Sequence, residues 1–392
     1  MTNTANTQLK TVNTNVINRE TAAQMPIEQL VKLLDLKNPL IEDIVYSDPR
    51  WSEMETVDAG DVFHPFVPKG KLTIQRPKYR HPQCVEANPH YVPQMNVLRP
   101  LLAWWCAGTR KLSLFMFGET GTGKTEMMLW FADRLNWPVV LTAVNESLRP
   151  EKTQGSYILF GDKTPFRYGS VAKAMKYGWA CIMDECDKGS GDLLSKLHTP
   201  AEYKPWQLDD TSEIILPHEN YRFLATGNTA GGGDMTGRYH TSQRLDEAFR
   251  RRFAFIECDY PDAATEDRII SAQYPDVTKE TRVKMVQLAV QMRLALKAPQ
   301  LEASAETPEK LAKLKLPTER LSCAFSTRVL IAWADYMNIF GINQIPLRES
   351  FDFSFGNSLD EEDRPAVYSI VQRVFGEAFD HPDGWSVANS GK

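Results

Sequence analysis

The feature that most constrains the fold of this chain is a glycine-rich octapeptide that follows a short apolar run. It fits the pattern G-x-x-x-x-G-K-[ST]. Residues 112–117 (LSLFMF) have the length and composition of a buried strand, and residues 126–135 (EMMLWFADRL) have helical spacing. In such a strand–loop–helix, glycines let backbone N–H groups surround a phosphate at the positive end of the helix. The octapeptide is therefore predicted to bind a nucleotide phosphate, and its members are Gly118, Glu119, Thr120, Gly121, Thr122, Gly123, Lys124 and Thr125.

Two side chains of the octapeptide suit a bound nucleotide and its metal ion. Lys124 is predicted to reach the β- and γ-phosphates of ATP, and the Thr125 hydroxyl is predicted to ligate Mg²⁺. An ordinary glycine-rich turn between a strand and a helix is the alternative. The rest of the chain bears on this choice, because ATP hydrolysis needs further polar groups at neighbouring strand ends.

The composition indicates a soluble globular protein. Hydrophobic residues make up 42% and charged residues 24% of the 392 residues, which leaves room for two or three domains. The net charge of −5 argues against a broad nucleic-acid surface. No apolar run is long enough to span a membrane, and the first 24 residues lack the apolar region of a secretory signal. The six cysteines form no C-x-x-C pair and no zinc spacing, which favours reduced thiols in a cytoplasmic protein.

Apolar runs that alternate with helical segments predict a parallel sheet with helices on both faces. After Pro261 the pattern changes to helices only, which predicts an all-helical lid domain. The predicted strands are residues 112–117, 138–143, 180–183, 221–226 and 253–258, and the later helices are residues 263–272, 279–296, 326–340 and 364–379.

The remaining segments have weaker patterns. Residues 1–24 are expected to be disordered, and residues 27–45 to form one or two short helices around Asn38-Pro39. Residues 46–95 are expected to form an irregular N-terminal module rich in proline and aromatic side chains. Residues 297–319 are expected to form a mobile loop. The predicted organisation is an N-terminal tail and module (1–87), a nucleotide-binding core (88–262), and a helical lid with a C-terminal tail (263–392).

The third predicted strand ends in two acids, Asp184 and Glu185. A carboxylate at the end of a buried strand must be hydrated, paired or bound to a metal. Asp184 is predicted to hold Mg²⁺, and Glu185 to polarise the water that attacks the γ-phosphate. An apolar run followed by Asp-Glu is a weak signal alone, and the phosphate-binding motif strengthens it.

Three other positions have both a functional and a structural interpretation. Asn228 follows the fourth predicted strand and could hold the attacking water, although a turn asparagine is the simpler interpretation. Arg250, Arg251 and Arg252 precede the last strand, and one of them could reach the γ-phosphate of a neighbouring subunit instead of binding a local acid. Arg328 begins a helix in the lid, where it faces either a local acid or a nucleotide between the domains.

In this order, these elements resemble the AAA+ ATPases, specifically the MoxR-type branch and its CobS-like members, CobS being the ATPase subunit of aerobic cobaltochelatase. The similarity covers residues 88–340. Its most specific part is FLATGNTAGGGDMTGRYHTSQ (residues 223–243) with the pair Arg252-Phe253. The resemblance implies that Arg252, in preference to Arg251, is the arginine finger, that Asn228 is sensor 1 and that Arg328 is sensor 2.

The resemblance also implies an assembly and a partner. AAA+ ATPases of this branch form homo-oligomeric rings, so a hexamer is expected. Residues 147–168 and 203–217 match inserts that face the ring pore or the partner in this branch, and simple surface decoration is the alternative. Exposed aromatic residues often anchor interfaces, so the inserts are expected to contact the partner through their aromatic side chains, which are Tyr157, Phe160, Tyr203 and Trp206. A protein with a von Willebrand A domain is an expected partner. Residues 1–87 and the tail after 345 match no motif of the family, so the substrate does not follow from the resemblance.

Four functions remain open at this stage. The first is an ATP-driven ring motor that remodels a partner protein, and the second is the ATPase subunit of a cobalt or magnesium chelatase. The third is a scaffold that binds ATP and hardly hydrolyses it, which the presence of Glu185 and Arg252 disfavours. The fourth is a DNA motor, which the acidic charge balance disfavours.

Overall fold

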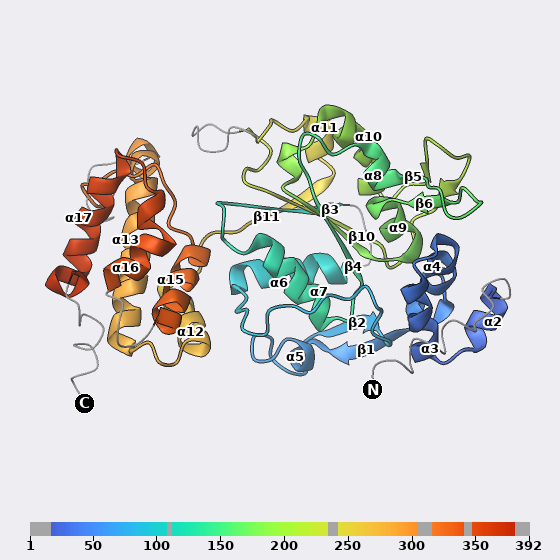
Figure 1. Cartoon of the computed structure of the whole chain (residues 1–392), viewed down its shortest axis with the longest axis horizontal. Helices are drawn as coiled ribbons and strands as arrows, with labels where there is room; N and C mark the ends of the chain where they lie inside the picture. Colours follow the sequence, from blue (N-terminus) through green and yellow to red (C-terminus); the bar gives the residue numbers. More distant parts are fainter. Residues whose placement is uncertain (1–16, 108–111, 234–241, 305–315, 341–346, 381–392) are drawn as a thin grey trace.

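The structure is a computed structural model of the whole chain, and it describes residues 17–107, 112–233, 242–304, 316–340 and 347–380. A mixed α/β part and a helical part lie side by side (Figure 1). Among the described residues, no helix is long and apolar enough to cross a bilayer. All six cysteines are free thiols, and Cys181, Cys186 and Cys258 are buried, as the cysteine pattern predicts.

The α/β part is built on a parallel sheet of five strands, in the order β11-β3-β10-β7-β4. This confirms the predicted sheet, and each predicted apolar run forms one strand. Long buried runs suit a parallel sheet, because helices cover both of its faces. The strands are β3 (Ser113–Phe117), β4 (Val139–Ala143), β7 (Ala180–Asp184), β10 (Arg222–Gly227) and β11 (Phe253–Glu257).

Side chains alternate between the two faces of the sheet and supply two separate hydrophobic cores. Phe115 and Phe223 contribute to the core under α9 and α10, whereas Leu114 and Leu224 contribute to the core under α6 and α7. Figure 1 shows these helix pairs on opposite sides of the strands. Their bounds are α6 (Met95–Cys106), α7 (Lys124–Arg134), α9 (Ser170–Tyr177) and α10 (Gly191–Ala201).

The N-terminal residues pack on both cores, so packing is continuous across the boundary proposed at residue 87. Short helices join the α9 core, and a two-stranded antiparallel ladder with Phe63 joins the α7 core, where the Phe63 ring lies 5.0 Å from that of Phe131. The expectation of disorder is therefore wrong for residues 19–24, which are helical, and the short helices expected within residues 27–45 are confirmed. Residues 46–95, expected to be irregular, contain the ladder and a short helix. The elements are α2 (Arg19–Gln24), α3 (Ile27–Lys32), α4 (Pro39–Tyr46), β1 (Met54–Asp58), α5 (Ala59–Val62) and β2 (Thr73–Pro77).

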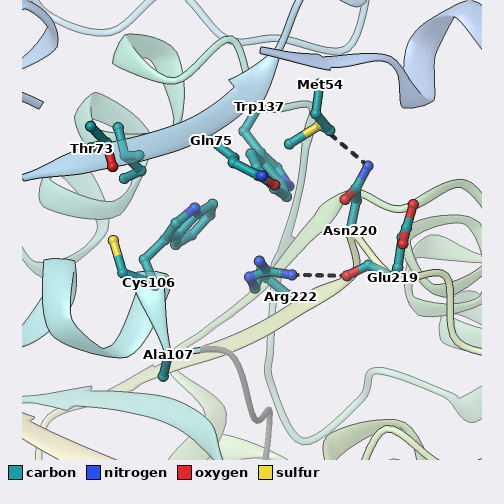
Figure 2. Close-up of a pocket in the computed structure, with 11 residues that line it drawn as sticks. Met54, Thr73, Gln75, Cys106, Ala107, Trp137, Glu219, Asn220 and Arg222 are labelled. Atoms are coloured by element: carbon teal, nitrogen blue, oxygen red, sulfur yellow. Dashed lines mark hydrogen bonds between the residues drawn. The ribbon is translucent and has the colours of Figure 1, made fainter. Parts of the chain in front are cut away.

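The ladder also lies beside the start of β10, where Met54 and Arg222 line the same hollow. There Arg222 lies beside two indole rings that contact each other, with its guanidinium carbon 5.4 Å from the ring of Trp105 and 5.0 Å from that of Trp137. Figure 2 shows Arg222, Trp137 and Asn220 around a hollow of about 300 Å³. The phosphate loop follows the carboxyl end of β3, so none of the predicted site residues lines this hollow.

The helical part forms a third core around Phe325, Trp333 and Phe351. It confirms the predicted all-helical region, with differences in detail. One helix extends to Ser304, so the predicted mobile loop is partly helical, and residues 305–315 lie outside the described residues. The sequence analysis missed α16. The helices are α12 (Ala263–Gln273), α13 (Lys279–Ser304), α15 (Thr327–Phe340), α16 (Leu347–Ser354) and α17 (Asp363–Phe375).

Candidate functional site

The glycine-rich octapeptide connects β3 to α7, as its pattern predicts. Two of its glycines are required by close approach. A Cβ on Gly118, whose φ is +148°, would lie 2.0 Å from the carbonyl oxygen of Cys258, and a Cβ on Gly121 would lie 2.5 Å from the Cβ of Ser326. The loop is thus wedged between the end of β11 and the start of α15.

Lys124 is the first residue of α7, and its ammonium group is held over the loop. Its Nζ donates to the carbonyl oxygens of Gly118 at 2.8 Å and Glu119 at 3.0 Å. Burial lowers the pKa of Lys124, while nearby acids oppose that shift. A cation held in a buried position at a helix N-terminus is suited to phosphate.

Asp184 ends β7 and lies between two threonine hydroxyls. Thr125 Oγ1 and Thr226 Oγ1 each donate to Asp184 Oδ1 at 2.6 Å. The structure therefore brings together the two residues that the sequence pairs as Mg²⁺ ligands, Thr125 and Asp184. Thr226, at the end of the neighbouring strand β10, was missed, although a threonine at the end of a buried apolar strand is a usable signal.

Glu185 follows Asp184 at a sharp bend of the backbone, with a left-handed φ of 57°. Its backbone N–H donates to Thr226 Oγ1 at 2.8 Å, which holds the bend against β10. The carboxylate is 43% exposed and pairs with Lys188 at 2.9 Å. A strained, non-glycine residue at a strand end is a feature of functional sites, because the surrounding structure must hold it there.

Asn228, the expected sensor 1, lies beside the loop, and its Oδ1 accepts a hydrogen bond from Thr120 Oγ1 at 3.3 Å. Asp187, which the sequence analysis missed, fixes this asparagine in place. Asp187 is fully buried, and its Oδ2 accepts the backbone N–H of Asn228 at 2.9 Å. The predicted motif continues beyond Asn228 into residues 234–241, which lie outside the described residues.

A hollow of about 240 Å³ adjoins the loop between the α/β part and the helical lid. One wall is the segment before α6, with Tyr91 and Val92, which was not predicted as part of the site. The opposite wall is the lid, where Arg328 lines the hollow near Gly121. The structure thus places the expected sensor 2 at the predicted nucleotide site. The complete lining is Asn88, His90, Tyr91, Val92, Gln94, Gly121, Thr122, Gly123, Glu126, Pro261, Ile269, Gln273, Thr327, Arg328 and Ile331.

The arginines around α11 (Glu247–Arg250) differ in exposure. The Arg252 side chain is 21% exposed and pairs with Glu202 of its own subunit at 2.7 Å. The Arg251 side chain is 79% exposed and pairs with Glu247 at 3.1 Å. Within a single subunit, Arg252 is therefore bound to a local acid, which is the structural alternative that the sequence left open.

The two inserts form hairpins, but one expected interface residue is buried. Trp206 is 5% exposed and belongs to the core, so its proposed part as an exposed anchor was wrong. Other apolar side chains of the inserts are exposed: Leu159, at 79%, and Leu216, at 68%, are the most exposed of them, and Tyr157, Phe160 and Ile214 are exposed as well. The inserts contain α8 (Pro150–Gln154), β5 (Gly155–Tyr157), β6 (Phe166–Tyr168), β8 (Trp206–Gln207) and β9 (Ile214–Ile215).

The donor set fits Mg²⁺. A threonine hydroxyl and a carboxylate oxygen lie within hydrogen-bond distance at the helix N-terminus, and oxygen ligands are those that Mg²⁺ prefers. No cluster of three or more His, Cys, Asp or Glu side chains able to hold a metal exists among the described residues. In nucleotide sites, Mg²⁺ is usually bound by one or two protein oxygens together with substrate phosphates.

Comparisons with known proteins agree with this geometry. Residues 113–253 match the family model described as an AAA domain (dynein-related subfamily). The chain is 29% identical to the aerobic cobaltochelatase subunit CobS of Sinorhizobium sp, over 74% of this chain and 82% of that protein. It is 27% identical to protein NorQ of Paracoccus denitrificans (56% and 77%), and 23% identical to protein CbbQ of Hydrogenophilus thermoluteolus (55% and 76%).

The parallel sheet, the phosphate loop and the helical lid define the chain as a member of the AAA+ class of nucleotide-binding proteins. Within that class it is similar to CobS, NorQ and CbbQ, which are MoxR-type AAA+ ATPases. Membership implies nucleotide binding and, as a rule, Mg²⁺.

Proposed function

We propose that this chain is a Mg²⁺-dependent ATPase that works as a ring and uses ATP hydrolysis to remodel a partner protein. The observation that carries the proposal is the grouping of Lys124, Thr125 and Asp184 at one end of the sheet, with Thr125 bonded to Asp184 at 2.6 Å. These are the cation and the oxygen ligands that phosphoryl transfer to water requires.

Each residue has a distinct part in the proposed reaction. Lys124 and the loop N–H groups hold the phosphates, and Thr125 and Asp184 would hold Mg²⁺, which neutralises phosphate charge when bound. Glu185 polarises the attacking water, and Asn228 orients it from the neighbouring strand end. Arg328 approaches the nucleotide from the lid, and Arg252 of an adjacent subunit stabilises charge on the γ-phosphate.

Replacing Lys124 with alanine tests the binding role. ATP affinity is expected to fall by about ten- to hundredfold, because a charge-assisted contact to phosphate is lost. Titration with a fluorescent ATP analogue in Mg²⁺ measures the effect. Lys78→Ala, at an exposed lysine paired with Glu53, is the matched control and is expected to bind as the wild type does. Equal affinity for the Lys124 variant would refute the site.

The partner surface is proposed to be formed by the exposed apolar residues of the two hairpins. Leu159 and Leu216 are more exposed than large apolar residues usually are, and exposed apolar groups often mark interfaces. The hairpins are also tied together, because Tyr168 donates to Glu213 at 2.6 Å. The partner expected from the resemblance is a von Willebrand A domain protein. In the alternative proposal, this chain is the ATPase subunit of a metal chelatase and its partner is the metal-insertion subunit. The similarity to the cobaltochelatase subunit supports this alternative.

Leu216→Ser tests this surface. Basal ATP hydrolysis is expected to stay within about twofold, because the side chain does not line the nucleotide hollow. In a pull-down with ATP, the Glu185→Gln variant is expected to retain its partner proteins. The double variant Glu185→Gln/Leu216→Ser is expected to lose them. Ile339→Ser, at a lid residue that is 64% exposed, is the control. If the captured proteins are unchanged, the hairpin is surface decoration.

A further inference from the structure

The segment that joins the sheet to the helical lid touches the phosphate loop through one side chain. Tyr260 lies between β11 and α12 and is 8% exposed. Its hydroxyl donates to the carbonyl oxygen of Thr120 at 3.0 Å. The Thr120 hydroxyl in turn donates to Asn228 at 3.3 Å, so this contact connects the joining segment with the expected sensor 1 as well.

On its other side, the Tyr260 ring packs against a buried ion pair of the lid. The guanidinium carbon of Arg293, on α13, lies 4.2 Å from the centre of the ring. Arg293 makes a two-point ion pair with Glu266 of α12, at 2.7 and 2.9 Å. The two side chains are 8% and 0% exposed.

The same ion pair holds a third lid helix. Thr327, the first residue of α15, donates to the Glu266 carboxylate at 2.7 Å, and Arg293 donates to the carbonyl oxygen of Phe325 at 2.9 Å. A buried charge pair is tolerated only when both partners are fully bonded, and its geometry then becomes rigid. The pair therefore fixes α12, α13 and α15 to one another and to Tyr260.

The start of α15 makes a second contact with the loop. Ser326 is packed so closely on Gly121 that a Cβ there would lie 2.5 Å from the serine Cβ. Two consecutive loop residues are therefore contacted from outside the loop. Thr120 is bonded to Tyr260 of the joining segment, and Gly121 packs against Ser326 of the lid. Arg328 follows two residues after Ser326, so the position of the expected sensor 2 depends on these contacts.

We propose that Tyr260 is a positioning residue, which couples the binding of a nucleotide phosphate in the loop to the orientation of the lid. The lid helices α12, α13 and α15 then move as one body, because the Arg293–Glu266 pair holds them together. This inference rests on the proposed function, since the trigger is a nucleotide. A phosphate in the loop requires inward-pointing N–H groups, and this fixes the direction of the Thr120 carbonyl that Tyr260 binds. The lid then adopts the orientation that this hydrogen bond selects.

Hydrogen exchange of full-length protein, with and without a non-hydrolysable ATP analogue and Mg²⁺, tests the coupling. In the wild type, the analogue is expected to slow exchange in α12 and α15 together. In Tyr260→Phe, analogue affinity is expected to stay within about tenfold of wild type, because one hydrogen bond is lost. The slowing in the lid is expected to fall by about three- to tenfold. Tyr274→Phe, which removes a phenol bonded within the lid to Asp335, is the control and is expected to respond as the wild type does.

The possible outcomes separate the two proposals. If Tyr260→Phe binds the analogue and hydrogen exchange in its lid slows as much as in the wild type, the coupling is overturned. The ATPase proposal would not be affected by that result. Failure of the wild type to bind the analogue would overturn the proposed function and the coupling with it. Glu266→Gln tests whether the ion pair makes the lid helices move together. In this variant the analogue is expected to change hydrogen exchange in α12 and α15 to different extents. Equal slowing in both helices, as in the wild type, would overturn this role of the ion pair.

Discussion

Replacing Arg252 with alanine is expected to slow ATP hydrolysis about a thousand-fold while ATP binding is retained. The reason is that an arginine supplied to the γ-phosphate stabilises charge that develops only in the transition state. Phosphate release at saturating ATP measures the rate, and titration with a fluorescent analogue measures binding. Arg251→Ala, at the more exposed neighbour, is the comparison and is expected to have the smaller effect.

The pairing of Arg252 with Glu202 makes the source of this arginine testable. In an isolated subunit the guanidinium is bound to a local carboxylate at 2.7 Å, so engagement of a neighbour's phosphate requires an exchange of partners. Hydrolysis should therefore rise more than linearly with protein concentration until rings are complete.

Mixing two inactive variants tests whether the arginine acts across the subunit boundary. In randomly mixed rings of Arg252→Ala and Glu185→Gln, about a quarter of the interfaces combine an intact Glu185 with an intact Arg252. Partial activity should therefore return. No recovery in rings shown to be mixed, or full activity in a proven monomer, would disprove the assignment, and Arg251 would then be the candidate.

Replacing Glu185 with glutamine is expected to abolish most hydrolysis and to preserve nucleotide binding. The amide keeps the size of the side chain but cannot polarise the attacking water, a function worth about a hundred- to ten-thousand-fold in rate. The Lys124, Thr125 and Asp184 groups, which are proposed to hold the nucleotide and the metal, stay intact. Single-turnover phosphate release and analogue binding measure the two quantities separately.

The matched control is Glu280→Gln, which makes the same change at an exposed position in the first turn of α13. It is expected to hydrolyse ATP at the wild-type rate. Wild-type hydrolysis by Glu185→Gln itself would show that another group activates the water. The buried Asp187, beside Asn228, would then be the first residue to examine.

The sequence alone was sufficient to predict the sheet and the residues that meet at the centre of the candidate site. Apolar runs that must be buried on both faces leave little choice but a parallel sheet, and the glycine–lysine–threonine pattern is contiguous in the chain. Asp184 and Glu185 could be placed because a carboxylate at the end of a buried strand needs a partner, and the carboxyl ends of parallel strands meet at one edge.

The N-terminal two-stranded ladder was not predicted because its signals are short. β1 and β2 are brief strands among prolines and aromatic residues, and their burial comes from packing on α6 and α7. Trp206 was misplaced for a related reason. An aromatic residue in an insert can face solvent or the core with the same local sequence, and only the packed sheet decides between them.

Only the tertiary structure decided which distant residues share a site. Tyr91 and Tyr260 come from separate segments, and no periodicity or motif links them to the phosphate loop. Arg252 could be assigned to a family position from sequence, but its bond to Glu202 depends on how α10 and α11 pack. Local patterns determine strands, helices and contiguous loops, because those depend on near neighbours along the chain. The partners of a buried polar group depend on the fold as a whole, since burial requires hydrogen bonds from whichever segments lie nearest in space.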